Sequence, residues 1–130
     1  MTVAALRVRY EETDAMGVVY HANYLRYFEV ARVELLRERG VSYAEMERRG
    51  YRLAVVEVHA EYRAPARFDD DLRVSCRVER VRSTRIDLGY EVKAGERLLC
   101  TGTTVLACIG PDGRPARLPG DVSGALEVTG

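Results

Sequence analysis

One long helical pattern stands alone in this sequence, and it limits the folds that the chain can adopt. Apolar side chains recur at helical spacing through residues 24–39 and share one face, formed by Tyr24, Tyr27, Phe28, Ala31, Leu35 and Leu36. Glu29 and Arg32, and then Glu34 and Arg37, are spaced to form ion pairs on the helix surface. A helix with so broad an apolar face must be covered by another element, so the pattern predicts a central helix packed against the rest of the chain.

Strand patterns make up most of the remaining sequence. Apolar and polar residues alternate in residues 6–10, 56–63, 72–79 and 86–93. Residues 98–109 are apolar on both faces, which is typical of a strand inside a sheet. The turns between the last four segments are short, and this predicts mainly antiparallel pairing.

The order of these segments predicts an α+β fold. One strand, the long helix and four further strands leave one sheet to cover one apolar helix, so we expect an antiparallel five-stranded sheet curved around a single central helix. A short second helix is expected to open at Ser42, which forms a capping box with Glu45, and to end at Gly50. With 130 residues and neither a linker nor an internal repeat, the chain is expected to be one domain, residues 1–130.

The charge balance and the spacing of the cysteines argue against several classes of function. The formal net charge is zero, so no overall field attracts nucleic acid or an anionic membrane. No apolar run resembles a signal peptide or is long enough to span a bilayer, so we expect a soluble cytoplasmic protein. The wide spacing of Cys76, Cys100 and Cys108 argues against disulfides and a zinc site and favours buried free thiols. His59 lies on the polar face of a strand and is expected to be exposed.

The loop at residues 11–22 places one acidic side chain, Asp14, between the first strand and the long helix. A carboxylate near a helix N-terminus is a common catalytic arrangement. The side chain serves as base or nucleophile, and the unpaired N–H groups of the first helical turn stabilise a developing negative charge. The alternative is that Asp14 only caps a turn in its own loop. Residue types alone leave both interpretations open.

A long motif surrounds Asp14 and reads Tyr10-Glu11-Glu12-Thr13-Asp14-Ala15-Met16-Gly17-Val18-Val19-Tyr20-His21-Ala22-Asn23-Tyr24. It resembles the signature of the 4-hydroxybenzoyl-CoA thioesterase family, which has the hotdog fold. It is most similar to the motif of the general bacterial acyl-CoA thioesterases of the Tol-Pal-associated type. The similarity continues through residues 27–32, 62–66, 69–70 and 117–119, and so spans nearly the whole chain. The resemblance implies an enzyme that hydrolyses the thioester of an acyl-CoA to free acid and coenzyme A, and we expect it to need no cofactor and no metal.

The resemblance also assigns roles within the motif. Asp14 matches the catalytic aspartate, and the backbone N–H at His21 polarises the thioester carbonyl, with the His21 imidazole lining the same region. Substrate contacts are expected close by, at Tyr10, Gly17, Val18 and Tyr20. Met16 stands where relatives often have a smaller residue, which predicts a narrower acyl pocket. Asp14 can act as a general base on water or attack the thioester to give a mixed anhydride, and the sequence does not separate these routes.

Three arginines, Arg80, Arg82 and Arg85, surround a hairpin turn later in the chain. Such a turn is either a solvated surface or a clamp for the phosphates of coenzyme A, because guanidinium groups bind phosphates in bidentate fashion. We take Arg82 and Arg85 as candidate substrate-binding residues.

Self-association is expected from two arguments. Uncovered strand edges and an apolar helix flanked by Tyr20, Tyr24 and Tyr27 need a partner surface. The resemblance implies a homodimer assembled into a homotetramer, with sites between subunits and an acyl-CoA as substrate. Two other functions stay open: a hotdog hydratase, which relies on a histidine in a different motif, and a hotdog protein that binds acyl-CoA or acyl carrier protein without turnover.

Overall fold

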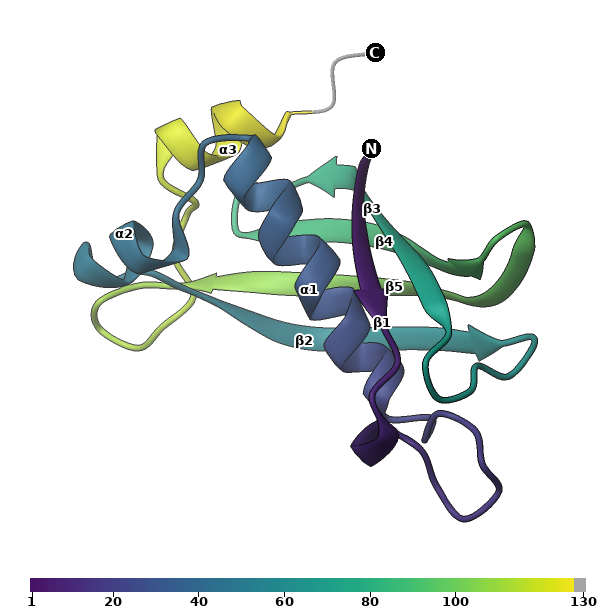
Figure 1. The fold of residues 1–130 in the computed structure, drawn as a ribbon. Helices are drawn as coiled ribbons and strands as arrows, with labels where there is room; N and C mark the ends of the chain where they lie inside the picture. The colour runs from purple at the N-terminus through teal and green to yellow at the C-terminus, as the bar shows by residue number, and fades with distance from the viewer. Residues whose placement is uncertain (128–130) are drawn as a thin grey trace.

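The chain folds into one antiparallel sheet with a long helix lying across one face (Figure 1). The structure, a computed structural model, describes residues 1–127. Its elements in chain order are β1 (Thr2–Arg7), the 3-10 turn η1 (Tyr10–Glu12), α1 (Asn23–Glu38), α2 (Tyr43–Arg48), β2 (Arg52–Tyr62), β3 (Asp71–Val81), β4 (Arg85–Ala94), β5 (Arg97–Ile109) and α3 (Gly120–Leu126). Among these residues, no helix has the length and apolarity needed to cross a membrane.

The strands are ordered β1-β3-β4-β5-β2, and every neighbouring pair is antiparallel. β5 therefore lies inside the sheet between β4 and β2, as its apolar faces predict. The two edges are β1 and β2. β2 follows α1 and α2 in the chain and pairs with β5. It therefore completes the sheet at the edge opposite to β1.

The core lies between α1 and the inner face of the sheet. Phe28 of α1 is fully buried, and its ring stacks on the ring of Tyr90 in β4 with centroids 4.4 Å apart. On β5 the ring approaches Gly102, where a Cβ atom would lie 2.4 Å from it. Only glycine allows this approach, so the Phe28 contact sets the distance between the helix and the sheet.

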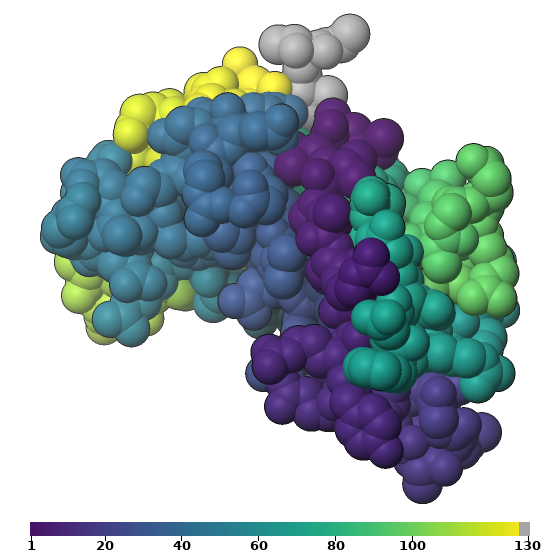
Figure 2. Space-filling view, in the orientation of Figure 1, coloured from purple at the N-terminus to yellow at the C-terminus, as the bar shows by residue number. Residues whose placement is uncertain are grey.

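The two ends of the sheet carry different parts of the chain. At the end where α1 begins, Tyr62 is paired with Cys100, and its hydroxyl donates a 3.0 Å hydrogen bond to the carbonyl of His21. We call this the loop end. At the far end, Arg52 is paired with Ile109, and α2, α3 and the β3–β4 turn lie together. In the space-filling view the loop after β1 forms one tip of the molecule, and α3 lies at the opposite tip (Figure 2).

The α+β class and the five-stranded antiparallel sheet are confirmed, but the expected position of the first strand is wrong. The strand predicted at residues 6–10 is β1 at Thr2–Arg7, and Tyr10 begins η1. β1 stops at Arg7 because its partner strand begins opposite, at Asp71. The alternation of apolar residues continues for one further step to the buried Val8, outside the regular strand.

Only one of the two predicted helical ion pairs forms. Glu34 and Arg37 are paired on the surface of α1. The pair expected between Glu29 and Arg32 is wrong, because the Arg32 side chain turns inward and donates a hydrogen bond to the Tyr90 hydroxyl. At the start of α2 the hydroxyl of Ser42 accepts a hydrogen bond from the backbone N–H of Glu45, as its capping pattern predicts.

Candidate active site

The loop that carries Asp14 is a small closed hairpin. Thr13 and Val19 form an isolated β-bridge, and inside it the N–H of Asp14 donates to the carbonyl of Val18 at 2.9 Å. The turn uses Gly17 at a φ of 76°, a conformation that side-chain-bearing residues rarely adopt. The N–H of Val19 donates to the carbonyl of Ala66 at 2.8 Å, so the hairpin is held against the segment between β2 and β3.

The Asp14 carboxylate has one oxygen engaged and one without a protein partner. Its Oδ1 accepts a 2.8 Å hydrogen bond from the backbone N–H of Met16, which makes Asp14 the cap of its own turn. No donor from residues 1–127 reaches the second oxygen. The hydrogen bond from Met16 fixes the carboxylate, and because the side chain is only half-buried, the second oxygen stays available to a ligand.

Glu12 fastens this loop to α1. Its side chain accepts 2.9 Å hydrogen bonds from the Tyr27 hydroxyl and the Arg9 N–H, and its carbonyl accepts 2.9 Å bonds from the Asn23 side-chain amide and the Tyr20 N–H. Burial and the bond to Glu12 raise the pKa of Tyr27 well above its usual value, so the phenol remains a donor at all ordinary pH values. The loop therefore has a fixed position relative to the first two turns of the helix.

The start of α1 offers free backbone donors. The helix has Ala22 as its N-cap residue, and no side chain caps it. Within the described chain, the N–H groups of His21 and Ala22 donate to no backbone or side-chain acceptor. His21 also lines a cavity of about 310 Å³, together with Val18, Tyr24 and Tyr62. Unpaired N–H groups beside a cavity can bind a carbonyl oxygen that gains negative charge.

The structure brings together only part of the predicted site. Asp14, Gly17, Val18 and His21 all lie on the hairpin or directly after it, and the exposed Tyr20 ring contacts the His21 ring, with centroids 4.5 Å apart. Tyr10 lies at the same end of the sheet. Its exposed ring packs on Phe68, with centroids 5.6 Å apart. Of the predicted site residues, only Val18 and His21 line the His21 cavity.

Arg82 and Arg85 lie at the far end of the sheet, so one protomer does not bring them to Asp14. The backbone of their turn is tied to the C-terminal segment by a 2.9 Å hydrogen bond from the Leu118 N–H to the Ser83 carbonyl. Arg82 is already paired with Asp87. Arg85, in contrast, takes part in no ion pair with a described residue.

The buried thiols do not provide a nucleophile. All three cysteines are free and buried. Burial raises the pKa of Cys76 to about 12 and that of Cys100 to about 11, so neither is a thiolate near neutral pH. His59 is exposed, as predicted, and lies 3.4 Å from Glu61. Among residues 1–127, no group of three or more side chains is arranged to hold a metal ion.

Two residues of the site were not identified from the sequence. Glu12 was not distinguished from Glu11, because its partner Tyr27 follows fifteen residues later and no short-range spacing links the two. Tyr62 follows Val58 and Ala60 in the alternation of its strand, and this predicts that its ring faces the helix. In the structure that ring packs edge-on against Tyr24, with centroids 5.3 Å apart.

Known proteins resemble this chain in both sequence and fold. The chain matches the thioesterase-like superfamily over residues 8–126. It is 36% identical over 116 residues to the acyl-CoA thioester hydrolase YbgC of Escherichia coli O6:H1, a match covering 88% of this chain and 87% of the relative. A hypothetical protein from Thermus thermophilus has a crystal structure with a TM-score of 0.94 and 40% identity over 97% of both chains. The DHNA-CoA thioesterase of Staphylococcus aureus has a TM-score of 0.86 and 36% identity over 90% of this chain and 80% of its own.

Replacing Tyr27 with Phe tests whether the Glu12 contact holds the Asp14 loop. The variant removes the hydroxyl that donates to Glu12 and leaves the buried ring. We expect amide hydrogen exchange at residues 14–20 to become about tenfold faster, because local opening no longer breaks a hydrogen bond to a charged group. Tyr51→Phe, at a tyrosine whose hydroxyl has no hydrogen bond in the described chain, is the matched control. Equal exchange in wild type and Tyr27→Phe would show that the loop is held without this contact.

Proposed function

The chain belongs to the thioesterase-like superfamily, and on that premise we propose that it hydrolyses the thioester of an acyl-CoA to a free acid and coenzyme A. The observation that carries the proposal is Asp14, whose carboxylate keeps one oxygen without a protein partner among the described residues. Glu12 ties the Asp14 loop to α1, and the helix begins with the unpaired N–H groups of His21 and Ala22. A carboxylate base on the loop that leads directly into these backbone donors is the set of groups that hydrolysis of an activated ester such as a thioester needs.

In this mechanism the His21 N–H donates a hydrogen bond to the thioester carbonyl oxygen. Asp14 accepts a proton from water while the water oxygen bonds to the carbonyl carbon. The tetrahedral intermediate then breaks its C–S bond, and the leaving coenzyme A sulfur takes the proton back from Asp14. In the second route Asp14 itself attacks the carbonyl carbon and expels the thiolate, and water hydrolyses the resulting mixed anhydride. Both routes use the same free carboxylate oxygen.

We further propose that the working unit is a homodimer formed along β2. One side of this eleven-residue strand has no partner among the described strands. Val55, Val56 and Val58 are each about half exposed on it, next to the exposed Leu25 of α1. Such an edge is covered most simply by an antiparallel copy of itself across a two-fold axis. Tyr24 and Tyr27 do not contribute, contrary to our expectation, because both are already buried within one protomer.

This dimer would give the far end of the sheet a role in the site. Two-fold pairing of antiparallel β2 strands places the far end of one protomer beside the loop end of its partner. The turn with Arg82 and Arg85 would then lie at the same end of the dimer as the other protomer's Asp14 loop. We propose that it binds the phosphates of coenzyme A there, with Arg85 contributing more because Arg82 is paired with Asp87. By the same resemblance we propose a homotetramer of two such dimers in the cytoplasm.

Asp14→Asn tests the catalytic role of the carboxylate. The amide oxygen of Asn keeps the hydrogen bond from Met16, so the loop is preserved while the base is lost. We expect kcat for thioester hydrolysis, measured by thiol release, to fall by about two to four orders of magnitude with an unchanged Tm. Asp112→Asn is the matched control, because Asp112 caps its own turn in the same way, through the N–H of Arg114, and lies outside the Asp14 loop. Near-normal turnover by Asp14→Asn would remove Asp14 from the mechanism. Binding of acyl-CoA without hydrolysis by the wild type would favour a carrier function.

Replacing Arg82 and Arg85 with Ala tests the phosphate clamp. Phosphates far from the thioester bind ground state and transition state equally, so we expect KM to rise about tenfold or more and kcat to change little. Arg85→Ala alone is expected to give most of the effect. The matched control is Arg48→Ala, which removes an exposed arginine paired with Glu45 on α2. An unchanged KM in the double variant would exclude this turn as the site that binds the phosphates.

Val56→Glu tests the β2 interface. In the dimer the substitution brings charges to the centre of an apolar contact, so we expect about 10- to 100-fold weaker self-association in sedimentation experiments. Val3→Glu on β1 is the control, since Val3 has a similar exposure on the other edge strand. A wild-type monomer with full activity would contradict both the assembly and a site shared between subunits.

A further inference from the structure

Arg32 is a cation inside the protein. It lies in the middle of α1 with only 8% of its surface exposed, and it is the one buried lysine or arginine among the described residues. Its Nη1 donates a 3.2 Å hydrogen bond to the hydroxyl of Tyr90, which is itself 2.7 Å from the hydroxyl of Thr104. Its Nε atom is buried and has no hydrogen-bond partner. The edge formed by Nε and Nη2 therefore donates no hydrogen bond within residues 1–127, and the Tyr43 hydroxyl is the further polar group close to the guanidinium.

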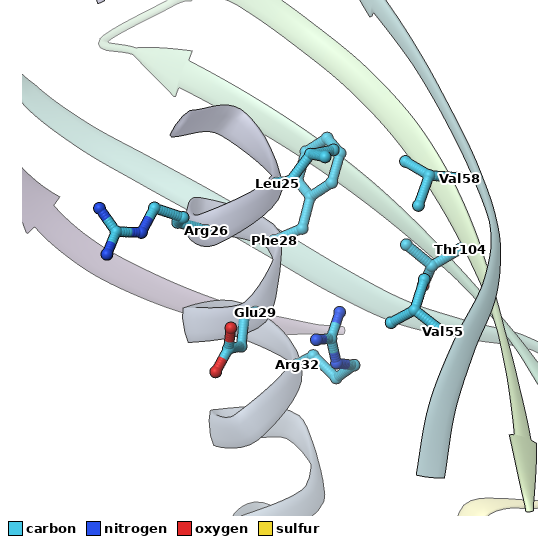
Figure 3. A pocket seen from close by; sticks show the side chains of 8 residues that line it. All are labelled: Leu25, Arg26, Phe28, Glu29, Arg32, Val55, Val58 and Thr104. Carbon is cyan, nitrogen blue, oxygen red and sulfur yellow. The ribbon is translucent and has the colours of Figure 1, made fainter. Parts of the chain in front are cut away.

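This buried charge has no counter-ion in the described chain. Arg32 forms none of the ion pairs found in residues 1–127. Glu29, one turn earlier on α1, lines the same cavity, but it forms no ion pair with Arg32 and its carboxylate is directed away from the guanidinium (Figure 3). Burial lowers the pKa of Arg32, but the phenol oxygens of Tyr90 and Tyr43 outweigh that effect, so the net direction is upward and the side chain stays charged. An unpaired buried cation is costly, and an anion is what would offset the cost.

The guanidinium faces a cavity of about 260 Å³ between α1 and the sheet. Leu25 and Phe28 of the helix form one side of it, and Val55 and Val58 of β2 form the other. Figure 3 shows the Arg32 head group on the inner side of the helix, turned toward the strands that carry Val55 and Thr104. The lining is mainly apolar and also includes the exposed Arg26 and Glu29, so Arg32 is the one buried charge of the cavity. A mainly apolar cavity with a buried cation suits an amphipathic ligand.

The cavity lies along the seam between α1 and β2, and the proposed reaction site lies on the same seam. The cavity beside His21 is lined by Tyr24 and Tyr62, and this second cavity begins one residue later on α1 and four residues earlier on β2, at Leu25 and Val58. The helix rises about 16 Å from His21 to Arg32, and helical side chains lean back toward the N-terminus, which shortens the gap. An acyl chain with its thioester at His21 can thus extend along α1 toward the Arg32 guanidinium.

We propose that Arg32 binds a carboxylate at the far end of the acyl group, so that the enzyme selects ω-carboxyacyl thioesters. This inference rests on the proposed thioesterase function and names the substrate class of that site. The free Nε–Nη2 edge matches the two oxygens of a carboxylate, and Tyr90 holds the remaining nitrogen in place. Leu25, Phe28 and Val58 contact the methylene chain between the two polar ends.

A carboxylate from a second subunit is the competing occupant. Two acidic residues lie on the parts of α1 and β2 beside the cavity, Glu29 and Glu57. Glu57 precedes Val58, so its side chain points to the opposite face of the sheet. Glu29 is directed away from Arg32 within its own chain. The guanidinium is also already buried in one protomer, so a partner's side chain would have to enter the cavity between α1 and β2 to reach it.

The test compares acyl-CoA pairs of equal chain length that differ only in the terminal carboxylate. These are octanoyl-CoA with suberoyl-CoA, and decanoyl-CoA with sebacoyl-CoA. Dissociation constants are measured by calorimetry with Asp14→Asn protein, and kcat/KM is measured with otherwise wild-type enzyme. We expect the carboxylated member of at least one pair to bind and react about 10- to 100-fold better. Arg32→Met should abolish this preference by weakening the carboxylated substrate alone, and Arg32→Lys should restore part of it.

Arg37→Met is the control, because Arg37 lies on the same helix and is paired with Glu34 on the surface. Equal binding of both members of both pairs by the wild type would overturn the inference. An equal loss for both members in Arg32→Met would do the same, and weaker dimerisation without a change in preference would assign Arg32 to the subunit interface. Hydrolysis of octanoyl-CoA without a preference would leave the proposed thioesterase function intact. If neither substrate is hydrolysed, the proposed function fails and the calorimetry still decides the role of Arg32.

Discussion

The contact between Phe28 and Gly102 is the constraint on which the rest of the structure depends. Because β5 has no side chain at Gly102, the Phe28 ring reaches the strand backbone and stacks on Tyr90. This contact sets both the distance and the rotation of α1. The rotation then decides what lies one turn before and one turn after Phe28 on the same face: Tyr24 toward the loop end, and Arg32 toward the cavity. The position of the hairpin and the burial of the Arg32 guanidinium thus both follow from the packing of Phe28 on Gly102.

Hydrogen bonds fix the position of the hairpin, because few of its side chains are buried in the core. Val19 is its one strongly buried apolar side chain. Glu12 connects it to α1, and the N–H of Val19 connects it to Ala66. The two interpretations of Asp14, turn cap and catalytic carboxylate, are compatible in this geometry. One oxygen holds the loop through Met16, and the other stays free for chemistry.

The sequence was sufficient for the fold and for the neighbourhood of Asp14, but not for features that depend on strand register. Alternation and the helical stripe predict the elements correctly, whereas the end of β1 depends on where β3 begins. Arg32 was assigned to the surface by its spacing from Glu29. Yet it lies four residues after Phe28 and four before Leu36, both fully buried, and that position predicts an inward side chain. Arg82 and Arg85 are neighbours in a turn, but only the folded sheet shows that this turn lies at the far end.

A buried arginine without a counter-ion is difficult to explain by stability alone. A long apolar side chain at position 32 would pack against Phe28 and Val55 without the cost of desolvating a charge. The fold instead supports the guanidinium with the hydroxyl of Tyr90, which is held by Thr104. Opposite charges therefore lie toward the two ends of the seam between α1 and β2: the Asp14 carboxylate at the helix start and the Arg32 guanidinium further along. A substrate with its own carboxylate would be attracted to the Arg32 end and repelled at the Asp14 end. The two charges would therefore exclude the reversed binding mode and leave the thioester at the helix start, where the reaction requires it.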